Sequence, residues 1–152
     1  MLLLVAPNQA YLDRLKNNLH TVYHETMKTP KRVKIFHFES DFNAVGDGKT
    51  INTMAFQLAI QAAKLYNEQN DNVKGVELKV GLPNENKTFV TGPFNLTSHF
   101  TLTVSSTNAI VASDDPNLWP IVAPLPSYGQ GRDHKGPRRA PFIGGVNLSD
   151  IT

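Results

Sequence analysis

Three stretches of the sequence carry side chains of the types that do chemistry. The first is a glycine-rich segment, residues 46–50, which contains Gly48-Lys49-Thr50. The second is the acidic pair Asp114-Asp115. The third is the basic stretch "GQGRDHKGPRRAP", whose cations are Arg132, Lys135, Arg138 and Arg139. Residues of these types bind phosphate, act as general acids and bases, and pair with carboxylates, respectively.

The glycine-rich segment matches a phosphate-binding loop only in part. Such a loop reads Gly-x-x-x-x-Gly-Lys-Ser/Thr, and counting back from Gly48 places its first glycine at the position of Asn43. That glycine is needed where backbone N–H groups curl around phosphates, a geometry that asparagine only partly tolerates. A strand before the loop and a helix after it are both expected, so nucleotide binding stays open as an alternative. The plainer interpretation is a Gly-Asp turn that reverses the chain ahead of a helix.

The segment after this turn has the strongest helical pattern in the chain. Asn52 is a candidate N-cap, and residues 53–68 contain neither glycine nor proline. The polar residues of this segment are spaced four, three and four apart and form one narrow stripe: Gln57, Gln61, Lys64 and Glu68. Because the rest of the circumference is apolar, we predict a capping or core helix that is covered on most of its sides.

The remaining patterns indicate short strands. Helical spacing predicts a surface helix over residues 10–27, and a strand is predicted over 31–38. After residue 72 the period changes to two, in "VELKV" from Val76 and in "FTLTV" from Phe100. Further short apolar runs begin at Thr88, Phe94, Ala109 and Phe142. No second helix separates these runs, which disfavours a doubly wound sheet and favours a sandwich or a strand solenoid.

Residues 113–141 form a predicted long loop that holds six of the ten prolines. A loop of this length without secondary structure is typical of functional or disordered segments.

Several of these stretches together resemble one family. The turn and its helix, "DFNAVGDGKTINTMAFQLAIQAA", are similar to the N-terminal signature of the pectin-lyase-like superfamily and, more narrowly, of the polygalacturonases, glycoside hydrolase family 28. The stretches "VTGPFNLTSHFTL", "DDPNLWPIVAPLPSYGQGRD" and "GVNLSDIT" resemble the next three landmarks in the right order. The resemblance covers residues 33–152, and residues 1–32 are left as an unmatched, partly helical segment. The stretch "NDNVKGVELKVGLPNENKTF" departs from the family's glycine-rich first strand.

The resemblance implies a mainly β fold, an incomplete right-handed parallel β-helix with an N-terminal capping α-helix. Residues 33–152 would supply the cap and the first coils, stacked about 4.8 Å apart. In that fold Phe100, Leu102 and Val104 point inward, and Thr101 and Thr103 point outward. An open last coil exposes apolar groups and unpaired backbone, so we also expect self-association through that end.

The family resembled hydrolyses the α-1,4-linked galacturonan of pectin with inversion of configuration. Its carboxylates come from an Asn-Thr-Asp and an Asp-Asp motif, and a Gly-His-Gly and an Arg-Ile-Lys motif follow. None of the four occurs at a matching place here, because Asn52-Thr53 is followed by Met54 and Asp114-Asp115 is interpreted as an Asx-type turn ahead of Pro116. We therefore assign no catalytic residue. The chain is either the N-terminal fragment of such an enzyme, inactive alone, or a non-catalytic solenoid remnant that at most binds acidic polysaccharide.

Charge and composition limit the partners. A net charge of +2 does not favour nucleic acid, and no apolar run is long enough to span a membrane. The absence of cysteine excludes disulfides and thiolate metal sites, and no cofactor or metal is expected. The candidates for binding galacturonan carboxylates are Arg132, Lys135, Arg138 and Arg139, although an ordinary solvated basic loop is the plainer interpretation of these residues. The family is secreted to the cell wall, whereas no signal peptide is recognisable in this chain.

Overall fold

The computed structural model describes Asp13 and residues 31–72, 74–123 and 137–152. The chain divides into two units, Met1–Lys31 and Arg32–Thr152. The helix predicted over 10–27 and the segment expected over 1–32 lie almost wholly outside the described residues, so their structure stays a prediction.

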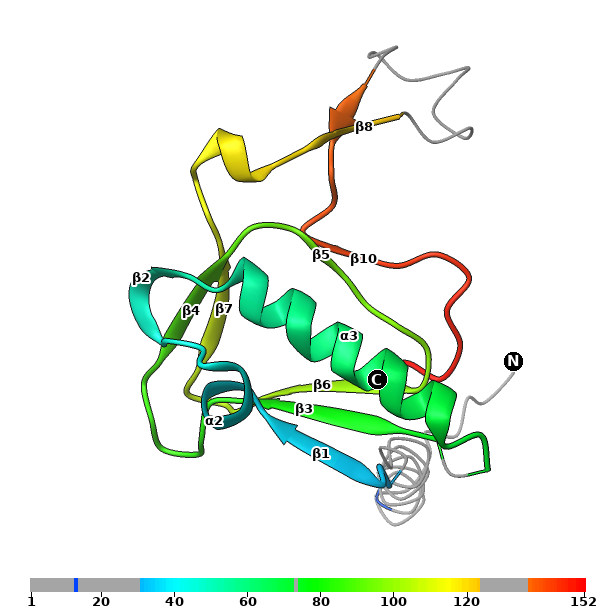
Figure 1. Cartoon of the computed structure of the whole chain (residues 1–152). Helices are drawn as coiled ribbons and strands as arrows, with labels where there is room; N and C mark the ends of the chain where they lie inside the picture. The colour runs from blue at the N-terminus through cyan, green and yellow to red at the C-terminus, as the bar shows by residue number, and fades with distance from the viewer. Residues whose placement is uncertain (1–12, 14–30, 73, 124–136) are drawn as a thin grey trace, which may run out of the picture. The chain divides into compact units, whose positions relative to one another are not determined.

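Parallel strands dominate the second unit and form three sheets around one helix (Figure 1). The first sheet has the order β1 (Lys34–His37), β3 (Val76–Val80) and β6 (Phe100–Val104). The second has the order β2 (Asp47–Ile51), β4 (Thr88–Thr91) and β7 (Ala109–Ala112). The third pairs β5 (Phe94–Asn95) with β10 (Ile143–Gly144). Every pair within these three sheets is parallel.

The strands follow one another in a repeating order. One pass of the chain contributes β3, β4 and β5, and the next contributes β6, β7 and β10, each strand lying beside its counterpart. After β10 the chain returns to the first sheet, where Ile151 forms a parallel bridge with Phe100. The predicted mainly β, parallel class is therefore confirmed. The sheets do not close into one solenoid, since β5 and β10 are two residues long and the β2–β4 ladder shifts register between Asp47 and Ile51.

The predicted helix is present as α3 (Thr53–Gln69), with Asn52 at its N-cap. The side chains of Phe56, Ala59 and Ala63 on one face are completely buried against the sheets. Phe56 is the centre of an aromatic stack, with its ring 4.3 Å from that of Phe94 and 4.1 Å from that of Phe38. These ring contacts join α3 to α2 and to β5, and α3 lies across the strands (Figure 1).

The opposite face of α3 is exposed, which corrects the prediction of cover on most sides. The exposed fractions are 65% for Met54, 47% for Leu58 and 48% for Leu65. Only one face of the helix packs on strands in the part of the chain that the structure describes. The prediction was wrong because a largely apolar helix circumference does not require burial on most sides. Isolated apolar side chains on a protein surface are common.

Strand β6 departs from the expected alternation of faces. Phe100 is completely buried as predicted, but Val104 is 37% exposed and Thr101 only 4% exposed. Thr101 is buried because its hydroxyl accepts a hydrogen bond of 2.8 Å from Nε of the buried Arg32. Val104 is exposed because β6 is the outermost named strand of its sheet, with Val80 beside it on one side.

An ion pair between the buried Arg32 and the exposed Asp150 joins residues far apart in the chain. Nη1 of Arg32 donates to Oδ2 of Asp150 at 2.6 Å, and Nη2 donates to the backbone carbonyl of Asp150 at 3.1 Å. Nδ1 of His99 lies 3.0 Å from the same carboxylate. The hydrogen bond from Arg32, opposed by burial and assisted by His99, lowers the pKa of Asp150.

Two predicted segments have more structure than expected. The strand expected over 31–38 is shorter, because Phe38 starts the one-turn helix α2 (Phe38–Phe42), which ends at Asn43 in the left-handed region with a φ of 54°. The expected loop over 113–141 contains the 3-10 helix η1 (Pro116–Leu118) and the antiparallel pair β8 (Ile121–Val122) and β9 (Arg138–Arg139). Residues 124–136 of that loop lie outside the described residues.

Candidate functional site

In the glycine turn, the carboxylate of Asp47 accepts the hydrogen bonds that the residues after it donate. Oδ1 of Asp47 accepts hydrogen bonds from the backbone N–H groups of Lys49 at 2.8 Å and Thr50 at 2.7 Å. Oδ2 accepts from the hydroxyl of Thr50 at 2.8 Å, while Gly48 adopts a φ of 73° that few other residues tolerate. These are the donors that would face a phosphate, and they lie in β2 instead of at the start of α3. The arrangement contradicts the phosphate-loop alternative and confirms the turn.

These hydrogen bonds predict how the carboxyl group of Asp47 titrates. The N–H groups of Thr50 and Lys49, followed by the Thr50 hydroxyl, lower the pKa of Asp47 from 3.8 to about 2. Because the folded pKa lies below the unfolded one, the stabilisation is fully present above the unfolded pKa and is lost as pH falls through about 2. Thr50→Val should raise the pKa of Asp47 towards 3.8, as measured by the pH dependence of its carboxyl 13C shift in nuclear magnetic resonance (NMR). An unchanged pKa would contradict this assignment.

Asn52 fastens the turn to the second sheet. Its side chain is 3% exposed, and Oδ1 accepts from the N–H of Val45 at 2.8 Å. Nδ2 donates to the carbonyls of Val45 at 3.0 Å, Thr50 at 2.8 Å and Val90 at 3.3 Å. The predicted N-cap position is confirmed, but the side chain makes no capping bond to the helix. Its bonds reach Val90, a partner that residue spacing does not reveal.

The acidic pair has the predicted structural role. Oδ1 of Asp115 accepts from the backbone N–H and from Nδ2 of Asn117, both at 2.9 Å, at the start of η1. Asp114 beside it is exposed. This is an Asx-type turn ahead of Pro116, as expected.

Several other carboxylates in the described residues also hold the fold together. Oε1 of Glu39 and Oε2 of Glu85 lie 2.6 and 2.7 Å from Nζ of Lys87, and Oε1 of Glu77 accepts from the hydroxyl of Thr103. Within residues 31–72, 74–123 and 137–152 and at Asp13, no three metal-ligating side chains cluster. None of the helices in this described part is long and apolar enough to cross a bilayer.

The basic candidates are only partly brought together. Arg138 and Arg139 form β9, and Nη1 of Arg139 donates to the carbonyls of Pro116 and Trp119, each at 2.7 Å. Arg139 therefore fastens η1 to β9, which is a structural task that sequence reasoning did not foresee. Arg132 and Lys135 lie outside the described residues. The assignment of these four residues to substrate binding stays a prediction.

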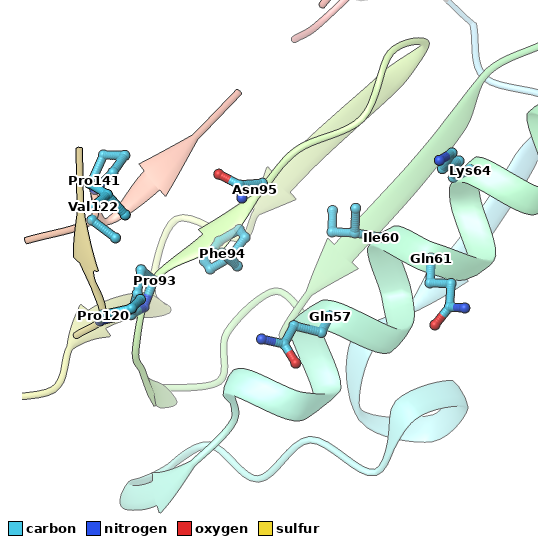
Figure 2. Close-up of a pocket in the computed structure, with 11 residues that line it drawn as sticks. Gln57, Ile60, Gln61, Lys64, Pro93, Phe94, Asn95, Pro120, Val122 and Pro141 are labelled. Carbon is cyan, nitrogen blue, oxygen red and sulfur yellow. The ribbon is translucent and has the colours of Figure 1, made fainter. Parts of the chain in front are cut away.

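A hollow that sequence reasoning missed lies between α3 and β5. Its volume is about 420 Å3. Figure 2 shows side chains of α3 on one side and of β5 on the other, with prolines nearby. The helix contributes Gln57, Ile60, Gln61 and Lys64, and the rest of the lining includes Pro93, Phe94, Asn95, Pro120 and Pro141. The polar stripe on the helix was the one sequence signal for this wall.

A second hollow of about 390 Å3 adjoins the first at Lys64, which lines both. Its walls are more polar than those of the first hollow and come from the end of α3 and from the segment between β5 and β6. Its lining includes Asn67, Glu68, Thr97, Ser98 and Ser149. We call the two hollows together the α3 groove.

Comparison with known proteins identifies relatives. The chain is 42% identical over 111 residues to a probable polygalacturonase from Vitis vinifera, which covers 73% of this chain and 21% of that protein. It is homologous to the polygalacturonases. No protein-family model matches the chain.

Solved polygalacturonases share the fold. The family 28 exopolygalacturonase of Yersinia enterocolitica has a TM-score of 0.55 and 28% identity, over 78% of this chain and 17% of that one. The hyperthermoactive exopolygalacturonase of Thermotoga maritima has a TM-score of 0.56 and 21% identity, over 87% of this chain and 27% of that one. The chain thus spans between 17% and 27% of the length of these polygalacturonases. The resemblance to family 28 is confirmed for that part.

Proposed function

We propose that this chain is the N-terminal part of a polygalacturonase-like glycosidase that hydrolyses the α-1,4-linked galacturonan of pectin with inversion. We further propose that the chain has no activity alone. The support is its homology to polygalacturonases together with the two successive passes of parallel strands, which have α3 packed over them. In this proposal α3 is the cap and β1 to β10 are the first coils of an incomplete parallel β-helix.

The proposal of inactivity rests on the roles of the carboxylates in this chain. Inverting hydrolysis needs an acid that protonates the leaving oxygen and a base that activates water, roughly 6.5–9.5 Å apart. The sequence lacks the Asn-Thr-Asp and Gly-His-Gly motifs that supply such groups in the family, and its Asp-Asp pair belongs to an Asx-type turn. Asp47, Asp115 and Asp150 are held by bonds that build turns and pair strands.

The test compares two lengths of the same gene product. The chain of 152 residues should release no reducing ends from polygalacturonate above the buffer blank. A longer product that continues past Thr152 into strands with the Asn-Thr-Asp and Gly-His-Gly motifs should release them. Release by the short chain would contradict its inactivity, and no release by such a longer product would contradict the glycosidase proposal.

The second candidate function is binding without catalysis. It is favoured by the basic pair Arg138 and Arg139 in β9, because guanidinium groups pair well with carboxylates of a polyanion. In this case the chain is a solenoid remnant that holds acidic polysaccharide. Since pectin is a wall polymer, either function would place the protein in the cell wall.

Self-association is part of the same proposal. The later strands and the return to the first sheet include exposed apolar side chains, with exposed fractions between 37% and 82% for Val104, Val111, Ile143, Val146 and Ile151. Such side chains, next to strand edges, favour contact between copies of the chain.

A further inference from the structure

We propose that the α3 groove binds a short acidic oligosaccharide, with Lys64 pairing with one of its carboxylates. The inference rests on the proposed function, since it takes its ligand class from the galacturonan of pectin. It names a site on the helix that is separate from the basic residues considered above.

The dimensions of the groove suit an extended ligand. Its two hollows, of about 420 and 390 Å3, each lie in the range of roughly 300–1,000 Å3 that is usual for small-molecule sites. Lys64 lines both hollows, so its ammonium group is within reach of a ligand in either one. A chain of a few sugar units has this elongated form.

The chemistry of the walls matches the parts of a sugar acid. The amides of Gln57, Gln61 and Asn95 in the first hollow, and the hydroxyls of Thr97 and Ser98 in the second, can donate to and accept from sugar hydroxyls. Apolar surface lies between them, from Ile60 and from the prolines Pro93, Pro120 and Pro141. Pyranose rings present hydroxyls at their edges and C–H groups on their faces, so both kinds of wall find partners.

Lys64 is the one charged side chain among the described residues that line the first hollow, which favours an anionic ligand there, whereas the second hollow is also lined by the carboxylates of Glu68 and Asp71. The side chain of Lys64 is 64% exposed, and Nζ lies 3.8 Å from the exposed carboxylate of Glu68. An exposed pair at that distance is weak, so the ammonium group can turn to a ligand carboxylate. Lys74, the other cation of the second hollow, already lies 2.9 Å from Asp71. Lys64 is therefore the anchor that the structure offers.

The experiment titrates the chain with trigalacturonate and follows backbone amides by NMR. We expect a Kd on the order of 1 mM, equivalent to about −4 kcal/mol. Shifts should be confined to the α3 groove, with the largest at Gln57, Gln61, Asn95 and Ser98. Lys64→Gln should weaken binding about fivefold to tenfold, and fully methyl-esterified trigalacturonate should bind the unchanged protein as weakly. Raising the salt concentration should remove most of the difference between the two ligands.

Two controls make the result specific. Lys49→Gln removes the same charge from exposed strand β2, away from the groove, and should leave the Kd unchanged. The single variant Arg138→Ala keeps the bonds of Arg139 to the carbonyls of Pro116 and Trp119; it tests the competing basic site and should also leave the Kd unchanged.

Three outcomes would overturn the proposal that the α3 groove binds the oligosaccharide. The first is equal binding by Lys64→Gln, and the second is equal binding of the esterified trimer. The third is loss of binding, or of the shifts, only in Arg138→Ala. Binding of acidic polysaccharide would then stand and the groove proposal would fail. If no trimer binds, both the groove and the non-catalytic candidate fail. The glycosidase proposal is still decided separately by the reducing-end assay.

Discussion

Replacing Phe56 by alanine is expected to abolish cooperative folding of the second unit. Phe56 is completely buried and lies between the rings of Phe94 and Phe38, at 4.3 and 4.1 Å. Truncating a buried phenylalanine costs about 3–5 kcal/mol, since it removes apolar area and leaves a cavity. Domains of this size have about 5–15 kcal/mol of stability in total, so the loss is a large fraction of it. The ring of Phe56 also joins α3 to β5 through Phe94 and to α2 through Phe38.

Urea denaturation followed by circular dichroism measures this effect. The midpoint for Phe56→Ala should fall by half or more, or no folded baseline should remain. Met54→Ala is the matched control, because Met54 is 65% exposed on the same helix and alanine suits a helix at both positions. Its midpoint should stay within error of the parent. If Phe56→Ala and Met54→Ala denature alike, α3 is not packed on the sheets as described.

Asn52→Asp is expected to have the second largest effect, and one that depends on pH. The carboxylate would keep the bond from the N–H of Val45, but it would face the carbonyls of Thr50 and Val90 in place of an amide donor. Lone pairs facing lone pairs in a buried site favour the protonated form, so the pKa of the new carboxyl should be raised. With the folded pKa above the unfolded one, the variant should be most stable below the unfolded pKa and should lose stability as pH rises through the folded pKa.

The free energy of unfolding at pH 4 and pH 7 measures this prediction. Asn52→Asp should lose clearly more at pH 7. Asn52→Ala, which leaves buried backbone groups without partners, should lose about 2–4 kcal/mol at both values of pH. Asn86→Asp, in the exposed loop between β3 and β4, is the control and should change little. A pH-independent loss for Asn52→Asp would mean that the amide does not face these carbonyls.

Local sequence patterns correctly predicted helix α3 and strand β3. Residues 53–68 have a cap, an unbroken run of helix formers and a polar stripe, and α3 follows them to within one residue. Val76, Leu78 and Val80 alternate with polar residues, and all three are completely buried in β3. In each case the information lies within the segment itself, at the period of the element it forms.

Features that depend on distant residues were beyond this reasoning. Thr101 is buried because of Arg32, sixty-nine residues earlier in the chain. The α3 groove needs Asn95 and Ser98 opposite the helix, and only the fold brings them there. Asn52 was predicted as a helix cap, yet its side-chain amide hydrogen-bonds to Val45 in the turn and to Val90 in β4. Local residue spacing cannot reveal these partners.

The link between Arg32 and Asp150 has a consequence for the order in which the protein is made. A ribosome produces Arg32 long before Asp150, and until Asp150 emerges the guanidinium has no carboxylate at its native position. Charges are costly to bury alone, so the nascent first sheet should keep Arg32 in water and remain unfinished. Contacts this distant in sequence also form slowly. The early part of the chain is therefore expected to complete its folding only after the late part has been synthesised. Until then we expect it to depend on cellular chaperones.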